Sequence, residues 1–182
     1  MTDYWECKSG VTLLEQINKR WPKRDKASDG WIGDDSHQAS VSDHNPCWTC
    51  TGDRYGVVRA RDFDADLGGK DAMDRLAGQL RRYARDRQDD DRLAYIIWDG
   101  AIASVTYGWE WRPYSGANDH AHHMHVSFTA RGDLRTAKFD LPIFTELERR
   151  RLTRLIGRLA DRIDTLRRRR ARAQRRRKNL GS

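Results

Sequence analysis

The chain is 182 residues long, which suits one globular domain with an appendage. Charged residues make up 34% of it, but seven tryptophans and six tyrosines supply enough bulky apolar surface for a modest core. The N-terminus lacks the basic start and apolar run of a secretion signal, and no window approaches the ~18 apolar residues of a membrane span. We therefore expect a protein made in the cytoplasm, with neither a signal peptide nor a membrane helix.

The net charge of +8 is concentrated at the C-terminal end. Residues 146–182 hold 15 Lys and Arg against 4 Asp and Glu, a net +11, whereas the other residues hold 20 against 23, a net −3. This asymmetry predicts an anionic partner for the tail, such as nucleic acid, a phosphate-bearing wall polymer or anionic lipid headgroups.

The first predicted helix begins at Thr12, where Thr-Leu-Leu-Glu has the form of a capping box, and ends at Trp21-Pro22. The stretch from Ser28 to Thr51 is rich in Asp, Ser, Gly and His and has no sustained period. It is predicted to be a polar loop, the kind of segment that often carries functional groups.

The middle of the chain alternates between strand and helix patterns. The predicted strands are residues 56–63, 93–98, 101–107 and 123–128. Asp99-Gly100 joins the second and third strands as a hairpin turn, and an apolar stripe at helical spacing predicts a helix over residues 71–87. The fold class is therefore α+β, with at least four short strands.

From Leu147 onward the pattern is helical. Apolar residues spaced by four, three, four and three positions form a seam of about two heptads, shorter than the ~3–4 heptads of a firm coiled coil. The seam consists of Leu152, Ile156, Leu159, Ile163 and Leu166. We expect residues 1–144 to form one domain and residues 145–182 a basic helical tail, whose seam either pairs chains in a weak oligomer or packs on the core.

Several polar residues have the types and the order of a hydrolytic zinc site. Such a site needs three His, Asp or Glu ligands and one open position, where zinc lowers the pKa of water to about 7 and polarises a carbonyl. His44 lies in the polar loop and Asp62 near the end of the next strand, while His123 and His125 share one face of a later strand.

Three short motifs resemble the Ser-x-His, Ala-x-Asp and His-x-His signatures of the D-Ala-D-Ala carboxypeptidase family and occur in the same order. They are Ser42-x-His44, Ala60-x-Asp62 and His123-x-His125. This family includes the L-alanyl-D-glutamate endopeptidases of phage endolysins and has hedgehog signalling domains as structural relatives. Residues 29–34, 42–46 and 111–116 look like the version found in actinobacteria and their phages, and the resemblance covers roughly residues 13–128.

The resemblance implies a fold and a set of site residues. The fold is a small antiparallel sheet with flanking helices, followed here by a basic C-terminal helix. The implied zinc ligands are His44, Asp62 and His125. His123 or His120 would act beside the metal as a base or as a stabiliser of the oxyanion. The candidate substrate-binding residues are Ser42, Trp111, Arg112 and Tyr114.

Two features depart from the family pattern. Many members carry a Glu or Asp three residues before the last ligand as general base, where this chain has His122, so the identity of the base stays open. Seventeen residues separate His44 from Asp62, where the compact pattern has six. Asp62 is favoured as the ligand because Asp64 lacks the Ala-x-Asp context and Asp66 lies beyond the strand.

Cys47 and Cys50 lie in this insertion. They suit half of a structural zinc site, a redox pair, a disulfide formed after export, or thiols without a catalytic role. A four-ligand zinc site would need two more partners, and no second Cys-x-x-Cys exists. Thiols without a catalytic role are the favoured interpretation. Trp109, Trp111 and Tyr114 suit either the walls of a substrate cleft or the core.

The sequence thus favours a zinc metallopeptidase that hydrolyses stem peptides of peptidoglycan, acting at the bacterial cell wall as a phage endolysin or a virion-associated lysin. The substrate class follows from the resemblance alone. The alternative is a non-catalytic module that keeps zinc for stability and binds nucleic acid or a virion partner through its basic tail.

Overall fold

The structure is a computed structural model that describes residues 3–34, 41–69 and 71–179. The chain divides into two compact units, Met1–Phe144 and Thr145–Ser182. Residues 35–40 of the predicted polar loop and residues 180–182 of the predicted tail lie outside the described residues. The first unit is α+β, which confirms the predicted fold class.

A five-stranded antiparallel sheet with strand order β3-β7-β4-β5-β6 forms the centre of the first unit. Its strands are β3 (Ala60–Asp64), β4 (Leu93–Trp98), β5 (Ala101–Ser104), β6 (Arg112–Pro113) and β7 (His123–Phe128). Two further short strands, β1 (Trp5–Glu6) and β2 (Val57–Val58), pair in parallel. Because β7 lies between β3 and β4, its side chains contact those of both neighbours.

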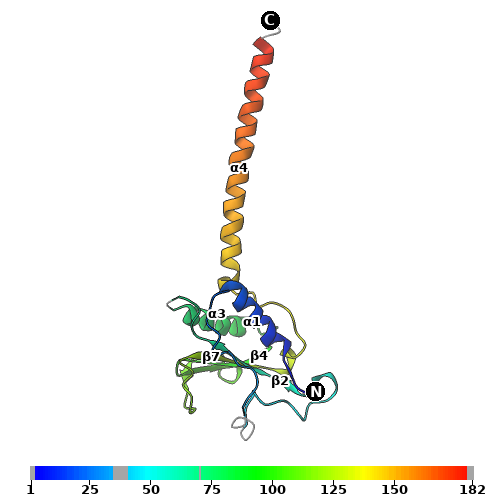
Figure 1. Ribbon diagram of the computed structural model, residues 1–182, viewed down its shortest axis with the longest axis vertical. Coiled ribbons are helices and arrows are strands. Elements are labelled where there is room, and N and C mark those ends of the chain that lie inside the picture. The colour runs from blue at the N-terminus through cyan, green and yellow to red at the C-terminus, as the bar shows by residue number, and fades with distance from the viewer. Residues whose placement is uncertain (1–2, 35–40, 70, 180–182) are drawn as a thin grey trace. The chain divides into compact units, whose positions relative to one another are not determined.

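Two helices, α1 (Lys8–Arg20) and α3 (Ala72–Asp86), lie on the same side of this sheet (Figure 1). Each presents an apolar stripe that is buried in the core. The core cluster includes Leu13 and Ile17 of α1, Leu76 and Leu80 of α3, and Phe63, Met124 and Val126 of the sheet. The helices are therefore attached to the sheet by buried apolar contacts, the main favourable contribution to folding.

Alternation along the strands gives the sheet two chemically different faces. Met124 and Val126 of β7 lie in the core, so His125 and Ser127 point to the face opposite the helices. Asp62 of β3 is the direct partner of His125 in the antiparallel register, and paired residues share a face. The register therefore brings two of the predicted ligands together.

The predicted hairpin at Asp99-Gly100 is confirmed. Both residues have positive φ, 46° and 72°, as a two-residue type I′ turn requires. The second strand of this hairpin is shorter than predicted and ends at Ser104, because Val105–Tyr107 forms a 3-10 helix that ends at Gly108 with φ 62°.

The predicted start of the first helix is wrong. The first helix begins at Lys8 instead of Thr12, because the Cys7 carbonyl already accepts hydrogen bonds from the backbone amides of Gly10 and Val11, at 3.0 and 3.3 Å. Thr12 therefore lies inside the helix and caps nothing.

The predicted strand over residues 56–63 is divided at Arg59 into β2 and β3. The Arg59 guanidinium donates from Nε and Nη2 to the two carboxylate oxygens of Asp133, both at 2.7 Å. Asp133 is completely buried, so this two-pronged ion pair supplies the partner that a buried carboxylate requires.

The second unit consists of the helix α4 (Pro142–Asn179) from Thr145 onward. The helix begins five residues before the predicted Leu147, at a proline, which is well tolerated in a first turn. All five residues of the predicted seam are exposed. In the described part of the chain, no helix is long and apolar enough to cross a membrane.

Candidate metal centre

His44, Asp62 and His125 converge on the polar face of the sheet. His125 Nδ1 lies 2.9 Å from Asp62 Oδ1, His44 Nε2 lies 3.3 Å from Asp62 Oδ2, and the two ring nitrogens are 3.2 Å apart. One ligand atom from each residue lies within 4.8 Å of the other two. This group could hold a metal ion.

Different elements deliver the three side chains. Asp62 and His125 come from adjacent strands, whereas His44 comes from the polar loop. That loop is fixed at His44 by two hydrogen bonds: the Gly33 amide donates to the His44 carbonyl at 3.0 Å, and the His44 amide donates to Ser42 Oγ at 3.3 Å. The predicted substrate residue Ser42 therefore holds the turn that positions a ligand.

Burial and charge act against each other at this site. Burial raises the pKa of Asp62, but the hydrogen bonds from His125 and His44 outweigh burial and hold this pKa well below the usual range. For His44, burial lowers the pKa, while the hydrogen bond and charge of Asp62 raise it to a net value above normal. The Asp62 carboxylate thus favours a cation beside it, whether a proton on histidine or a metal ion.

Ser127 and Tyr95 hold the His125 ring from its other sides. His125 Nε2 lies 2.9 Å from Ser127 Oγ, and the Tyr95 ring stacks on His125 with centroids 5.4 Å apart and an interplanar angle of 18°. Donation from Nε2–H to Ser127 would leave Nδ1 to face a metal, the arrangement that commonly orients histidine ligands.

Sequence reasoning assigned neither Ser127 nor Tyr95 to the site. Alternation with His125 places Ser127 on the polar face and could have suggested it. Tyr95 is the direct β4 partner of Ser127, a fact that depends on the pairing of β4 with β7.

His123 and His120 lie beside the three candidate ligands. His123 Nε2 is 3.9 Å from Asp62 Oδ2, and the His120 ring centroid is 4.9 Å from that of His123 and 5.5 Å from that of His125. His120 Nδ1 donates to the Asn118 carbonyl at 2.7 Å, which leaves Nε2 as a proton acceptor.

Both of these histidines are kept neutral by their surroundings. Burial and the neighbouring His125 lower the pKa of His120 to about 4. Burial also lowers the pKa of His123, by more than the opposing charge of Asp62 raises it. A neutral imidazole can accept a proton near pH 7, so either ring has the protonation state that a general base needs.

The remaining predicted substrate residues are spread over the edge of the sheet. The Tyr114 ring lies 5.4 Å from His120 in an edge-to-face contact, which places it beside the candidate base. Arg112 is exposed and its guanidinium lies 4.2 Å from the centre of the Tyr107 ring. Trp111 packs partly buried against the core, so the structure brings Tyr114 to the histidines but turns Trp111 to the core.

Trp109 is 6% exposed and belongs to the core cluster, which decides between its two interpretations in favour of the core. Asp64 is buried, and its carboxylate accepts hydrogen bonds from the backbone amides of Ser28 and Asp66 at 2.9 and 2.8 Å. These bonds give Asp64 a structural role and leave Asp62 as the carboxylate of the cluster.

Cys47 and Cys50 form a disulfide, so the favoured interpretation as two thiols is wrong and the disulfide alternative holds. The insertion closes on itself next to β2: the Cys47 amide donates to the Val57 carbonyl at 2.8 Å, and the Gly56 amide donates to the Cys47 carbonyl at 3.0 Å. This explains how an insertion between two ligand motifs leaves the ligands together.

No family model, curated protein or solved structure matches this chain. The geometry of the candidate metal centre and the short motifs of the sequence are therefore the features that point to its function.

Proposed function

We propose that this protein is a zinc metallopeptidase that hydrolyses peptide bonds in bacterial peptidoglycan. The observation that supports this most strongly is the convergence of His44, Asp62 and His125, with two neutral histidines beside them. The substrate class and the setting of a phage endolysin or virion-associated lysin rest on the resemblance of the three motifs to the D-Ala-D-Ala carboxypeptidase family.

Zinc fits the donors that are present. Two imidazoles and one carboxylate form a typical catalytic ligand set, and three protein ligands leave the fourth position open. Zinc bonds of about 2.0–2.1 Å in a tetrahedron place ligand atoms roughly 3.3 Å apart. In the protein, His44 Nε2 lies 3.2 Å from His125 Nδ1 and 3.3 Å from Asp62 Oδ2, so little movement is needed to bind the ion.

When bound, zinc supplies a Lewis acid that polarises the scissile carbonyl and acidifies water. His120 Nε2 is assigned to accept the proton of the attacking water, because its Nδ1–H is committed to the Asn118 carbonyl and Nε2 is left unprotonated. His123 lies on the same face and is assigned to the oxygen of the carbonyl under attack. Tyr114, packed on His120, is assigned to the bound stem peptide.

The test is release of new amino groups from purified actinobacterial peptidoglycan, together with the metal content of the protein. We expect one bound zinc, loss of hydrolysis on chelation and its return on adding zinc. His125→Ala should lose both zinc and hydrolysis, while His122→Ala, at an exposed position outside β7, should keep both and serves as the matched control. Absence of zinc from the wild-type protein would contradict the proposal.

A second candidate function is a non-catalytic module that keeps its metal for stability and binds nucleic acid or a virion partner through its tail. The observation that favours it is His122, which is exposed and stands where many members of the resembled family carry a carboxylate base. Bound zinc without cleavage, together with salt-dependent DNA binding, would support this alternative.

A further inference from the structure

The second unit carries an exposed apolar surface that the proposed activity does not use. Six residues of α4, here called the apolar stripe, are between 47% and 62% exposed. They are Leu152, Leu155, Ile156, Leu159, Ile163 and Leu166. Successive residues of a helix are separated by 100°, so these positions fall on one side of α4. Exposed Leu and Ile in a continuous row indicate an interaction surface.

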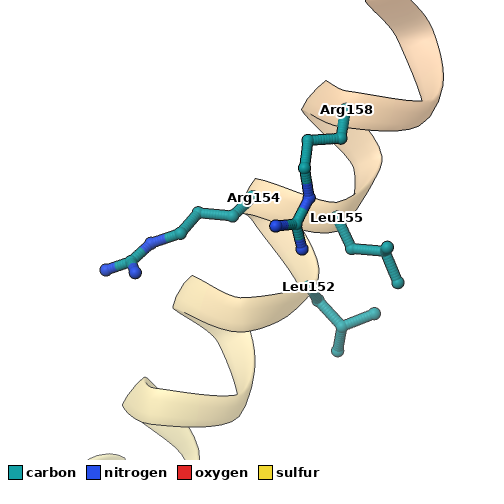
Figure 2. A pocket seen from close by; sticks show the side chains of 4 residues that line it. All are labelled: Leu152, Arg154, Leu155 and Arg158. Carbon is teal, nitrogen blue, oxygen red and sulfur yellow. The ribbon is translucent and has the colours of Figure 1, made fainter. Parts of the chain in front are cut away.

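Arginines occupy another side of the same segment. Arg154, Arg158 and Arg162 recur at intervals of four residues and are exposed. Figure 2 shows Leu152 and Leu155 pointing away from Arg154. Together with Arg158, these three residues line a shallow surface groove. The segment therefore combines an apolar side with a cationic side. A partner must match both.

A second copy of the chain matches the apolar stripe but not the charge. In a parallel two-stranded coiled coil, Arg162 of one chain would face Arg167 of the other across the seam, a repulsive pair. The next seam position after Leu166 is Arg170, so the apolar seam stops after about two heptads. Each copy would also bring a tail of net charge +11, formed by 15 cationic and 4 anionic residues.

Nucleic acid matches the charge but not the apolar stripe. Phosphates would pair with the arginines, and six Leu and Ile side chains would stay in water. The chain has no aromatic residue after Phe144, so beyond its first turn α4 has no aromatic side chain on which a nucleic-acid base could stack.

We propose that residues 152–166 of α4 bind the surface of an anionic lipid bilayer. The apolar stripe enters the boundary between headgroups and acyl chains, with the helix axis parallel to the membrane. Arg158 and Arg162, which flank the stripe, contact headgroup phosphates, and Arg154 on the opposite side adds to the longer-range attraction. This orientation agrees with the absence, in the described residues, of a helix that could cross a membrane. The inference concerns a separate unit of the chain and does not depend on the proposed peptidase activity.

The test is co-sedimentation of the full chain with vesicles of phosphatidylglycerol and phosphatidylcholine in equal parts, compared with phosphatidylcholine alone. Ile156→Gln with Ile163→Gln removes two members of the stripe without changing charge. Its matched control is Thr153→Gln with Thr165→Gln, which introduces the same residue on another side of the helix. Circular dichroism checks that helix content is retained in each variant.

We expect binding to the anionic vesicles only. The stripe variant should bind about tenfold more weakly or worse, and the control should bind like the wild type. Replacing Arg154, Arg158 and Arg162 by Gln should weaken binding roughly 100-fold, because each basic residue near an anionic surface contributes to the attraction.

Three results would overturn the proposal. The first is equal vesicle binding by the stripe variant and the wild type, since charge alone would then be responsible. The second is a dimer in analytical ultracentrifugation that the stripe variant abolishes, without vesicle binding by the wild type. The third is binding to short duplex DNA that is tighter than binding to vesicles and unaffected by the stripe variant.

Discussion

The two faces of strand β7, which is six residues long, differ in what they contact: one packs in the core and the other faces the candidate metal centre. Met124 and Val126 are completely buried against the helix side of the sheet. His125 and Ser127, one position further along in each case, belong to the candidate metal centre on the opposite face. Neighbours in sequence should therefore respond to mutation in different ways: Met124 and Val126 through folding, His125 and Ser127 through metal binding and catalysis.

The largest effect is expected at His120, which lies beside the candidate ligands on the polar face of the sheet. His120→Asn removes the assigned base and should lower kcat for peptidoglycan hydrolysis by about 10²–10⁴-fold, the usual contribution of general-base catalysis. Zinc content should change little, because His120 is not among the candidate ligands. His120 is buried and its Nδ1 donates to the Asn118 carbonyl, so kcat is compared per folded protein. If kcat is retained and His123→Asn abolishes it instead, the two histidines have exchanged roles.

The next effect is expected on the core side. Met124→Ala removes a completely buried side chain and should destabilise the protein by about 2–5 kcal/mol. Chemical denaturation with urea measures this change. The folded fraction should still bind one zinc per chain, and loss of zinc from folded protein would show that the two faces are coupled.

Ser127→Ala should have an intermediate effect on metal binding. It removes the partner of His125 Nε2 and should weaken zinc affinity by about 10–100-fold, as loss of a group that orients a ligand usually does. A competition titration with a zinc indicator measures the affinity. Val126→Ala is the matched control on the other face and should lower the free energy of unfolding instead, with zinc affinity unchanged.

The smallest effect concerns pH and the metal-free protein. The raised pKa of His44 stabilises the fold below its unfolded value of 6.5, and this contribution is lost as pH rises through the folded value. The lowered pKa of Asp62 stabilises the fold above 3.8 and is lost at lower pH. The lowered pKa values of His120 and His123 act in the opposite sense, because they favour the folded state as pH rises through 6.5. The contribution of His44 is therefore measured as a difference: as pH rises above 6.5, the Tm of chelated wild-type protein should decline relative to that of Asp62→Asn.

Asp62→Asn provides the control for this pH dependence, because it removes the charge that raises the pKa of His44. Its Tm should lack the loss that the raised pKa of His44 causes in the wild type above pH 6.5. Parallel curves for the wild type and Asp62→Asn would show that His44 and Asp62 are not linked in this way.

Much of the fold was predictable because its signals are local. The hairpin at Asp99-Gly100 depends on two residues that accept positive φ, and β7 follows from strict alternation over residues 123–128. The ends of elements were harder to predict. Lys8 begins α1 with no side-chain cap, and at the division between β2 and β3 the Arg59 amide donates to the carbonyl of Asp43, a residue of the polar loop.

The candidate site was predictable as far as residue type carries information. His44, Asp62 and His125 were selected by the order of three short motifs, Ser-x-His, Ala-x-Asp and His-x-His, and the structure brings them together. Tyr95 could not be found in this way, because its place beside His125 follows from the register of β4 on β7. The disulfide between Cys47 and Cys50 likewise depends on how the insertion folds.

Anomalous X-ray diffraction at the zinc edge tests whether His44, Asp62 and His125 hold a zinc ion. Crystals of the protein grown with zinc should give one strong anomalous peak within about 2.0–2.2 Å of His44 Nε2, His125 Nδ1 and an Asp62 carboxylate oxygen. Crystals without a peak at these atoms, or with a peak only elsewhere, would show that these three residues do not hold zinc.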